Sequence, residues 1–242
     1  MQTAKRGRAL PYLIVAAFLG VVPSSFAAQT ANMSLTGVGT NGTLGGVYIG
    51  PYVGTVNGVT TPLICDDFID ESYIPETWTA DVYSISDYAS LRFHSSTAPL
   101  AQVGYEEVAW LSQQLTNQSL GLPTTCTNTT SINCAGDIQY AIWAVFDPTA
   151  LTYITGANRT NANTWLSAAQ SHYSTGDYSN VSVYTAVAGT ALCGGRACPP
   201  GPTPQEFIVV RTPEPPFLSL LGVDLSAVGG LIFFLKRKVI TA

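Results

Sequence analysis

An apolar run near the C-terminal end of the chain limits what the rest of it can be. Residues 216–235 are mostly apolar, and Lys236, Arg237 and Lys238 follow them directly. About twenty such residues are enough to cross the hydrocarbon core of a bilayer as a helix. A basic cluster beside a span tends to stay on the cytoplasmic side. The sequence therefore predicts a transmembrane helix over 216–235, with the chain before it on the other side of the membrane.

The N-terminal end predicts export independently. Lys5, Arg6 and Arg8 precede an apolar stretch over residues 10–22, and residues 25–27 place small side chains at the two positions that a signal peptidase reads. We expect a signal peptide over 1–27, cleaved after Ala27. A retained N-terminal anchor is the alternative, although the apolar stretch is short for a span. The folding unit is then an extracytoplasmic domain over 28–212.

The tripeptide Pro213-Glu214-Pro215 stands directly before the apolar run. A Pro-Glu-Pro motif, one transmembrane helix and a short basic end, here over 213–238, resemble the PEP-CTERM sorting signal of exported bacterial proteins. The resemblance implies that an exosortase recognises the tripeptide, cleaves near it, and releases or transfers the domain to the cell surface or polysaccharide matrix. The two ends of the chain predict signal peptidase, exosortase and the membrane as partners, and exopolysaccharide or an amine-bearing surface ligand is a further candidate partner. An ordinary tail anchor is the alternative.

The extracytoplasmic domain is acidic and poor in charge. It contains four arginines against thirteen carboxylates, a net charge of −9, and only 10% of the whole chain is charged. An acidic surface repels phosphate backbones, so we expect no nucleic-acid partner. No lysine occurs between Ala28 and Leu235. The polar surface must come from serine, threonine, asparagine and glutamine.

Five cysteines leave one without a partner inside the chain. Cys126 and Cys134 bracket a polar loop, and Cys193 and Cys198 bracket a glycine-rich turn. Disulfides persist in exported proteins, so each pair is a candidate bridge. Cys65 is then the remaining thiol. Other pairings stay open, but each of them also leaves one cysteine over.

Strand patterns at both ends of the domain enclose helical patterns in the middle. Asn57-Gly58 predicts a hairpin turn, Asp137 is a candidate helix cap, and Pro148 should end the helix that follows it. Residues 29–46, rich in glycine and threonine, predict a loose arm or short edge strands. The sequence therefore predicts an α+β fold with an antiparallel β core, sandwich or barrel-like, and a helical insertion. The expected strands are 47–50, 52–56, 59–68, 78–85, 180–187 and 206–210, and the expected helices are 105–115, 138–146 and 161–173.

A run of acidic residues follows Cys65. Asp66, Asp67, Asp70, Glu71 and Glu76 could supply oxygen ligands for Ca²⁺, but their spacing is not that of an EF-hand loop. The run therefore predicts a solvated acidic edge, and no metal or cofactor is expected.

Cys65 and a later helix form the one pattern with chemistry in it. Leu63-Ile64-Cys65-Asp66 ends a predicted strand, and Ile138-Gln139-Tyr140-Ala141-Ile142-Trp143 places Gln139 and Trp143 one helical turn apart. Together they resemble the thioester domain of Gram-positive surface adhesins. The resemblance implies that the Cys65 thiol attacks the Gln139 carboxamide, expels ammonia and leaves an internal thioester that an outside amine can open. Trp143 would then shield the bond from water.

Three classes of function follow, none of them an enzyme. The favoured one is a non-enzymatic cell-surface or matrix protein, and the alternative is a covalent adhesin that uses a Cys65–Gln139 bond. A carbohydrate-binding matrix module is a second alternative, for which Trp78 and Trp110 are candidate contacts. Conventional catalysis lacks support, because His94 and His172 form no metal-ligand pair and no nucleophile motif occurs. Cys65 can equally be a structural core thiol.

Overall fold

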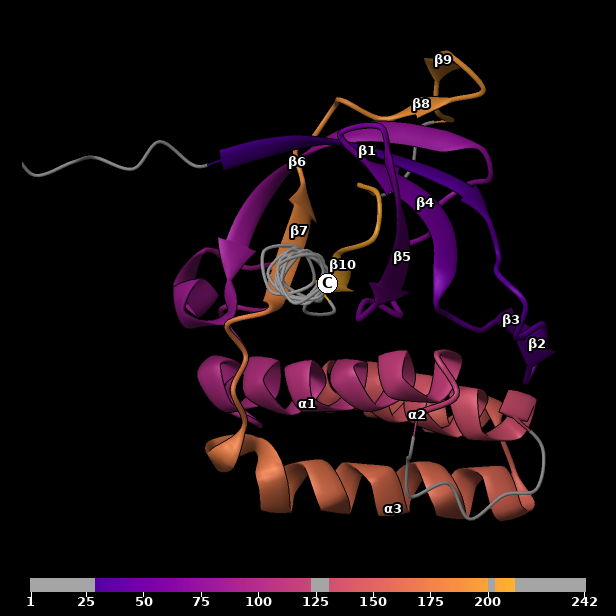
Figure 1. Cartoon of the computed structure of the whole chain (residues 1–242), viewed down its shortest axis with the longest axis vertical. Coiled ribbons are helices and arrows are strands. Elements are labelled where there is room, and N and C mark those ends of the chain that lie inside the picture. The colour runs from indigo at the N-terminus through magenta and orange to yellow at the C-terminus, as the bar shows by residue number, and fades with distance from the viewer. Residues whose placement is uncertain (1–28, 123–130, 200–202, 212–242) are drawn as a thin grey trace, which may run out of the picture.

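The computed structural model describes residues 29–122, 131–199 and 203–211 as an antiparallel β-barrel with helices stacked against it (Figure 1). The predicted α+β class with an antiparallel β core is confirmed, and the core is a barrel. Six strands form its wall in the order β1, β4, β5, β10, β7 and β6. Because β1 pairs with both β4 and β6, the ring closes. The bounds of these strands are β1 Gln29–Gly37, β4 Tyr52–Val56, β5 Val59–Cys65, β6 Glu76–Ser84, β7 Val181–Ala186 and β10 Phe207–Val210.

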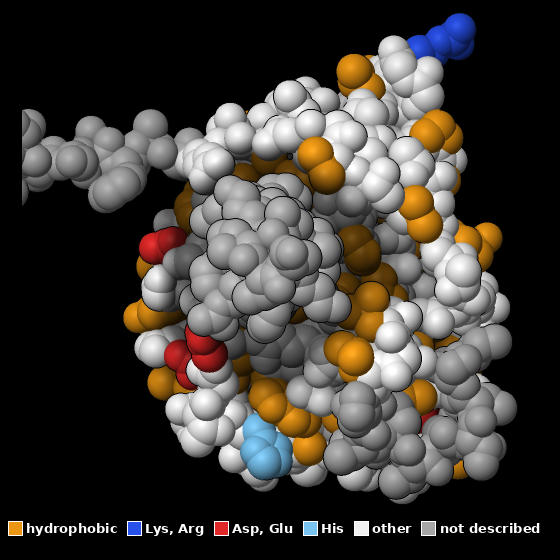
Figure 2. Space-filling view, viewed as in Figure 1, with side chains coloured by type: hydrophobic (Ala, Val, Ile, Leu, Met, Phe, Trp, Pro, Cys, Tyr) orange, Lys and Arg blue, Asp and Glu red, His pale blue; other side chains and the backbone are white. Residues whose placement is uncertain are grey.

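Two short hairpins extend from the barrel. One consists of β2 (Thr43–Leu44) and β3 (Val47–Tyr48), and the other of β8 (Leu192–Cys193) and β9 (Arg196–Ala197), which continues the sheet from β6. On the face drawn in Figure 2, basic side chains are visible only at the β8–β9 hairpin. The rest of that face is mostly neutral, in agreement with the low content of charged residues.

The N-terminal arm is the part of the fold that the sequence predicted wrongly. Residues 29–37 form the nine-residue strand β1, which closes the barrel rather than lying at an edge. Ala31, Met33 and Leu35 alternate into the interior and are almost fully buried. This short apolar alternation among threonine, serine and asparagine was hidden by the glycine-rich segment behind it.

The hairpin between β4 and β5 matches its prediction. Asn57 and Gly58 both adopt positive φ angles, of 51° and 80°. Two consecutive left-handed residues suit the right-handed twist of the paired strands. The turn places Tyr52 of β4 opposite Leu63 of β5, and so fixes which residues of β5 point into the barrel.

Three helices lie beneath the barrel in two layers. In Figure 1, α1 (Ala101–Ser119) and α2 (Ser131–Phe146) lie side by side below it, with α3 (Gly156–His172) beneath them. All three predicted helices are present, but each begins earlier than expected. Asp137 is therefore inside α2 instead of capping it, and its buried carboxylate accepts a hydrogen bond from Asn161 Nδ2 of α3 at 3.0 Å. Short 3-10 helices cover 85–90, 148–153 and 173–175.

The barrel wall separates two hydrophobic cores. Inward-facing side chains, among them Met33, Trp78 and Phe207, fill the barrel. Outward-facing residues of the same strands, such as Ile64 and Ile208, pack with the helices. Alternation along a strand produces this division. Within the described residues, no helix is long and apolar enough to span a membrane, and the predicted span over 216–235 lies outside them.

One buried carboxylate of α1 predicts a pH-dependent stability. Burial raises the pKa of Glu107 from 4.5 to about 7. The folded state therefore binds a proton that the unfolded state has lost, and the stability associated with the neutral form is lost as pH rises between these values. We expect the free energy of unfolding of Glu107→Gln, measured with urea, to vary less with pH than that of the wild type between pH 5 and pH 8, roughly the window set by this shift. The neighbouring Glu106→Gln, at a more exposed position, is the control and should leave the wild-type slope unchanged. A wild-type slope in Glu107→Gln would contradict the assignment.

Candidate functional site

Cys65 ends β5 inside the barrel. It lies between β4 and β10, its register partner is Phe207, and its side chain belongs to the interior core. The residue is fully buried, and it is the free cysteine of the described chain. The prediction that Cys65 is the remaining thiol on an inner strand is confirmed.

Gln139 reaches this cysteine from α2. The side chain is fully buried, and its Nε2 donates a hydrogen bond to the carbonyl oxygen of Cys65 at 2.7 Å. Seventy-four residues separate the two positions in the chain. The helix thus holds a primary carboxamide against the strand end that carries the thiol.

Gly50 makes room for the carboxamide. A Cβ at this position would lie only 2.6 Å from Oε1 of Gln139 and 3.3 Å from Cε2 of Tyr52. Any larger residue would therefore compete with the carboxamide for the same space. Gly50 stands before the start of β4, and nothing in its spacing to Cys65 or Gln139 marked it in the sequence.

The thiol is held in its protonated form. Its Sγ donates to the carbonyl oxygen of Asp67 at 3.0 Å. Burial raises the pKa of Cys65 well above its usual value, the carboxylates of Asp67 and Asp66 raise it further, and the nearby indole of Trp143 acts in the opposite direction. A buried thiol with a raised pKa is a poor target for external oxidants and alkylating agents. Its chemistry depends on what the protein places beside it.

Trp143 covers the site, one helical turn beyond Gln139. Only 1% of its surface is exposed, and its ring centroid lies 5.1 Å from that of Phe68 and 5.0 Å from that of Tyr140. Among the described residues, neither Nε1 of Trp143 nor Oε1 of Gln139 has a hydrogen-bond partner. An unpaired donor and an unpaired acceptor thus belong to the same dry site, which is unusual for buried polar groups.

A cleft of about 620 Å³ is lined in part by Trp143 and Phe68, the two residues that cover the site. Tyr52, Trp143 and Phe207 belong to its lining. Tyr52 and Phe207 also belong to the interior core that contains Cys65. We call this cavity the tyrosine cleft, because its lining also includes Tyr48, Tyr73 and Tyr153.

The acidic run after Cys65 is not the solvated edge that was predicted. Asp66, Asp67 and Glu76 are buried, and only Asp70 and Glu71 remain partly or fully accessible. The sequence did not reveal the burial because the compensating groups come from elsewhere in the chain. Burial, and then the nearby Glu206 and Asp67, raise the pKa of Asp66 well above its usual value.

Arg92 provides the positive charge of this buried cluster. Its guanidinium forms ion pairs with Asp67 and, at 2.6 Å, with Asp70, and it donates to the carbonyl oxygen of Pro204 at 2.7 Å. Its backbone N–H also donates to Glu206 Oε2 at 3.1 Å. Arg92 therefore helps to hold the loop after β5, and Gln205 Nε2 also donates to the Asp67 carbonyl oxygen of this loop at 2.7 Å.

Glu206 completes the cluster from the residue before β10. Oε1 accepts a hydrogen bond from the hydroxyl of Tyr105 at 2.7 Å, and Oε2 accepts one from Thr185. Burial raises the pKa of Glu206, although these hydrogen bonds and Arg92 act against the shift. Sequence reasoning missed this residue. Its signal was an acidic residue placed directly before an apolar strand.

Of the two predicted disulfides, one lies wholly within the described residues and the other does not. The Cys193–Cys198 bridge is present and closes the β8–β9 hairpin. Cys134 is disulfide-bonded, whereas Cys126 lies outside the described residues. In the described chain, the one group of side chains with metal-ligand spacing is Glu76 with Cys193 and Cys198. Because those two sulfurs are bonded to each other, they offer no thiolates to an ion.

The predicted carbohydrate contacts are largely enclosed. Trp78 is 3% exposed and packs against Phe207 inside the barrel, so it cannot touch a glycan. Trp110 is half-buried and stacks on His172 at a ring distance of 5.4 Å. His94 is exposed, and its Nδ1 lies 2.8 Å from the Leu91 carbonyl oxygen.

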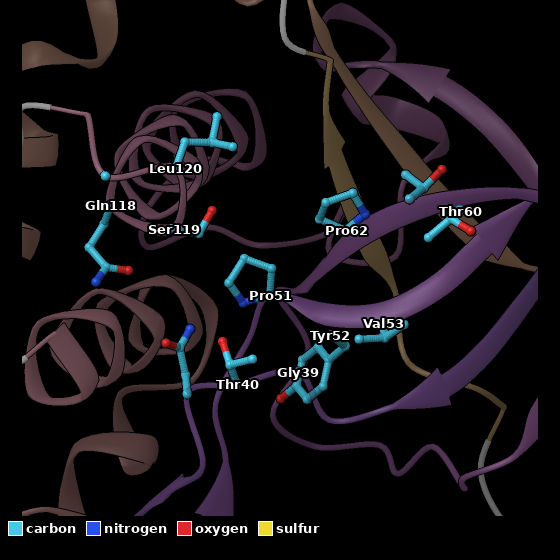
Figure 3. A pocket seen from close by; sticks show the side chains of 13 residues that line it. Gly39, Thr40, Pro51, Tyr52, Val53, Thr60, Pro62, Gln118, Ser119 and Leu120 are labelled. Atoms are coloured by element: carbon cyan, nitrogen blue, oxygen red, sulfur yellow. The ribbon is translucent and has the colours of Figure 1, made fainter.

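A second cavity, of about 520 Å³, lies between β4, β5 and the end of α1. Figure 3 shows Pro51, just before β4, beside Ser119 at the end of α1, and Pro62 of β5 and Leu120 also line the cavity. No acidic or basic side chain lines it, so it has no group for acid–base chemistry. Tyr52 belongs to the lining of this cavity and of the tyrosine cleft.

The residues of the predicted sorting segment lie outside the described chain: Pro213, Glu214, Pro215, Lys236, Arg237 and Lys238. Comparisons with protein-family models, with curated proteins and with solved structures give no match to this chain.

Proposed function

We propose that this protein forms an internal thioester between Cys65 and Gln139 and uses it to attach covalently to an amine-bearing partner. The observation that carries the proposal is the contact between the Gln139 carboxamide and Cys65, in a pocket that Gly50 leaves open. Two residues so far apart in sequence are in contact, the cysteine is free, and both are fully buried. A structural core thiol is also free and buried, but it needs no carboxamide held beside it in a space that a glycine leaves open.

The chemistry follows from the held geometry. Sγ attacks the Cδ carbon of Gln139, the C–N bond breaks, and the proton of the thiol ends on the departing nitrogen, so that ammonia is released. Because the raised pKa keeps the thiol protonated, positioning must supply much of the rate. Negative charge develops on Oε1 during attack. The indole N–H of Trp143, whose interaction with the Cys65 thiol lowers the pKa of that thiol, is a donor at this site.

Exclusion of water and of internal amines preserves the product. Trp143 and Phe68 cover the bond against hydrolysis. The domain has no lysine between Ala28 and Leu235, so no ε-amine of the domain can open its own thioester. The bond is then reserved for an external amine.

Intact mass spectrometry of the purified protein tests the proposal. We expect a mass lower than that of the disulfide-bonded chain by one ammonia molecule, and methylamine should then add its full mass. Cys65→Ala and Gln139→Ala should show neither change. A mass that is not lowered by one ammonia molecule, together with a titratable thiol at Cys65 after denaturation, would refute the thioester.

Trp143 permits a separate test of the attack step. Trp143→Phe keeps an aromatic cover but removes the indole N–H. Loss of one donor to a developing oxyanion typically slows a reaction by about 10²–10³-fold. We therefore expect slower ammonia loss, followed by mass spectrometry after refolding, while the finished bond hydrolyses at the wild-type rate. Trp110→Phe, at the stacked pair with His172, is the control. If Trp143→Phe and the wild type form the thioester at equal rates, the indole N–H does not assist the attack and Trp143 only shields the bond.

We also propose that the domain is exported and sorted as its two ends indicate. The signal peptide over 1–27 would be removed by signal peptidase, and an exosortase would act near Pro213-Glu214-Pro215. The barrel supports this division, because β1 begins at Gln29 and β10 ends at Val210, inside the proposed domain. C-terminal peptide mapping of membrane-bound and released protein tests it. Full-length chains alone in both fractions would count against processing.

A further inference from the structure

The tyrosine cleft gathers a type of side chain that is otherwise kept from solvent. In the described part of the chain, three tyrosines are strongly exposed: Tyr48 at 54%, Tyr73 at 38% and Tyr153 at 55%. All three line this one cleft, although they come from three distant segments. Ile69 and Ile74 add exposed apolar surface to it. Such clustering of exposed rings marks a binding surface rather than scattered surface residues.

The charge of the cleft is negative. Asp70 and Glu71 line it, and no arginine, lysine or histidine does. Asp70 is paired with Arg92, whereas Glu71 has no ion-pair or hydrogen-bond partner among the described residues. A carboxylate without a partner, beside exposed aromatic faces, favours a cationic occupant.

The size and the lining of the cleft favour an amino sugar over a lysine side chain as the cationic occupant. Its volume of about 620 Å³ falls within the range of small-molecule sites, and is larger than one aminoalkyl chain needs. Flat tyrosine rings can stack on the C–H faces of pyranose rings, and their hydroxyl groups, with Ser72, can bond sugar hydroxyls. A lysine side chain would use the carboxylate but leave most of this surface empty.

We propose that the tyrosine cleft binds a chain of amino sugars and that an amine of this chain is the acceptor for the thioester. The acceptor step rests on the proposed function, whereas binding does not. In that step, the ammonium first loses a proton to water at the mouth of the cleft. The amine then attacks the acyl carbon, the C–N bond forms as the C–S bond breaks, and the remaining proton returns to Sγ as the thiol. The floor of the cleft, formed by Tyr52, Trp143 and Phe207, places the occupant next to the bond.

Binding is tested without the covalent step. In Cys65→Ala, titration calorimetry with a glucosamine tetramer should show binding that weakens about tenfold in Tyr48→Ala and in Tyr153→Ala, the cost typical of an aromatic anchor. Tyr173→Ala, at a half-buried position outside the cleft, is the control and should bind as Cys65→Ala does. The N-acetylated tetramer should bind more weakly, because it lacks the charge that Glu71 attracts. Equal binding of both tetramers, or no effect of the tyrosine variants, would overturn the proposal.

The acceptor step is tested with the wild-type protein. Intact mass should increase by the full mass of the glucosamine tetramer, and this adduct should form faster than the adduct of a lysine peptide at equal concentration. Preference for the peptide would overturn the amino-sugar assignment and point to a protein partner. Tyrosine-dependent binding in a protein that never loses ammonia would refute the thioester and the acceptor step, but would leave the binding site supported.

Discussion

Replacing Gly50 with alanine is expected to abolish thioester formation while leaving the barrel folded. The added Cβ would lie 2.6 Å from Oε1 of Gln139, too close for any real contact. The atom that must yield is the end of a flexible side chain, so the backbone can stay in place. The carboxamide, however, is fully buried and can move only by losing its position against Cys65. A displacement of about 1 Å from a reactive geometry can cost about 10²-fold in rate. Ammonia loss, followed by intact mass, measures the effect.

The matched control for this variant is Gly37→Ala. Gly37 is also a glycine without a positive φ angle, and a Cβ there would meet Val53 at an ordinary 3.5 Å. We expect this variant to lose ammonia at the wild-type rate. If Gly50→Ala forms the thioester as readily as Gly37→Ala does, the space beside Oε1 is not required for the reaction.

Removing the positive charge of Arg92 is expected to destabilise the domain strongly, because the side chain pairs with a buried carboxylate. Arg92→Met keeps much of the apolar stem but leaves buried Asp67 without its ion pair and removes a donor from Asp70 and Pro204. Breaking a buried pair by deleting one partner typically costs about 3–5 kcal/mol. The side chain of Arg92 is only 16% exposed, so solvent replaces little of what is lost. Urea unfolding measures the change.

Arg196→Met removes the same charge from the exposed tip of the β8–β9 hairpin and serves as the control. Exposed charges of this kind contribute little, and we expect a change within about 0.5 kcal/mol. A loss below about 1 kcal/mol for Arg92→Met would contradict the view that Asp67 depends on this ion pair.

The parts of the fold that depend on local pattern were predictable from the sequence. Asn57-Gly58 specified the hairpin that directs Cys65 into the barrel, and the period of α2 placed Gln139 and Trp143 on one side. The strand β1 was missed because barrel closure is a property of the ring and not of the segment. Its three buried apolar residues become informative only when β4 and β6 lie on either side.

The surroundings of the site were harder to predict than its centre. Five acidic residues within residues 66–76 suggested a solvated edge, because nothing near them in sequence neutralises charge. The neutralising Arg92 is brought in by another segment, and its backbone N–H also holds Glu206. Gly50 lies 89 positions from the side chain that it accommodates, and only the three-dimensional contact identifies its role.

The pairing of β5 with β10 has a consequence for when the chemistry can begin. Cys65 meets its neighbour Phe207 on one of the last strands of the domain to be synthesised, and the first strand, β1, must wait for β6 before the ring is complete. A nascent chain that has reached only residue 200 therefore lacks β10, the strand that pairs with β5 beside Cys65. Under the proposed function, the thioester would form only in chains whose translation had reached the end of the domain, and truncated copies would keep a free thiol at Cys65.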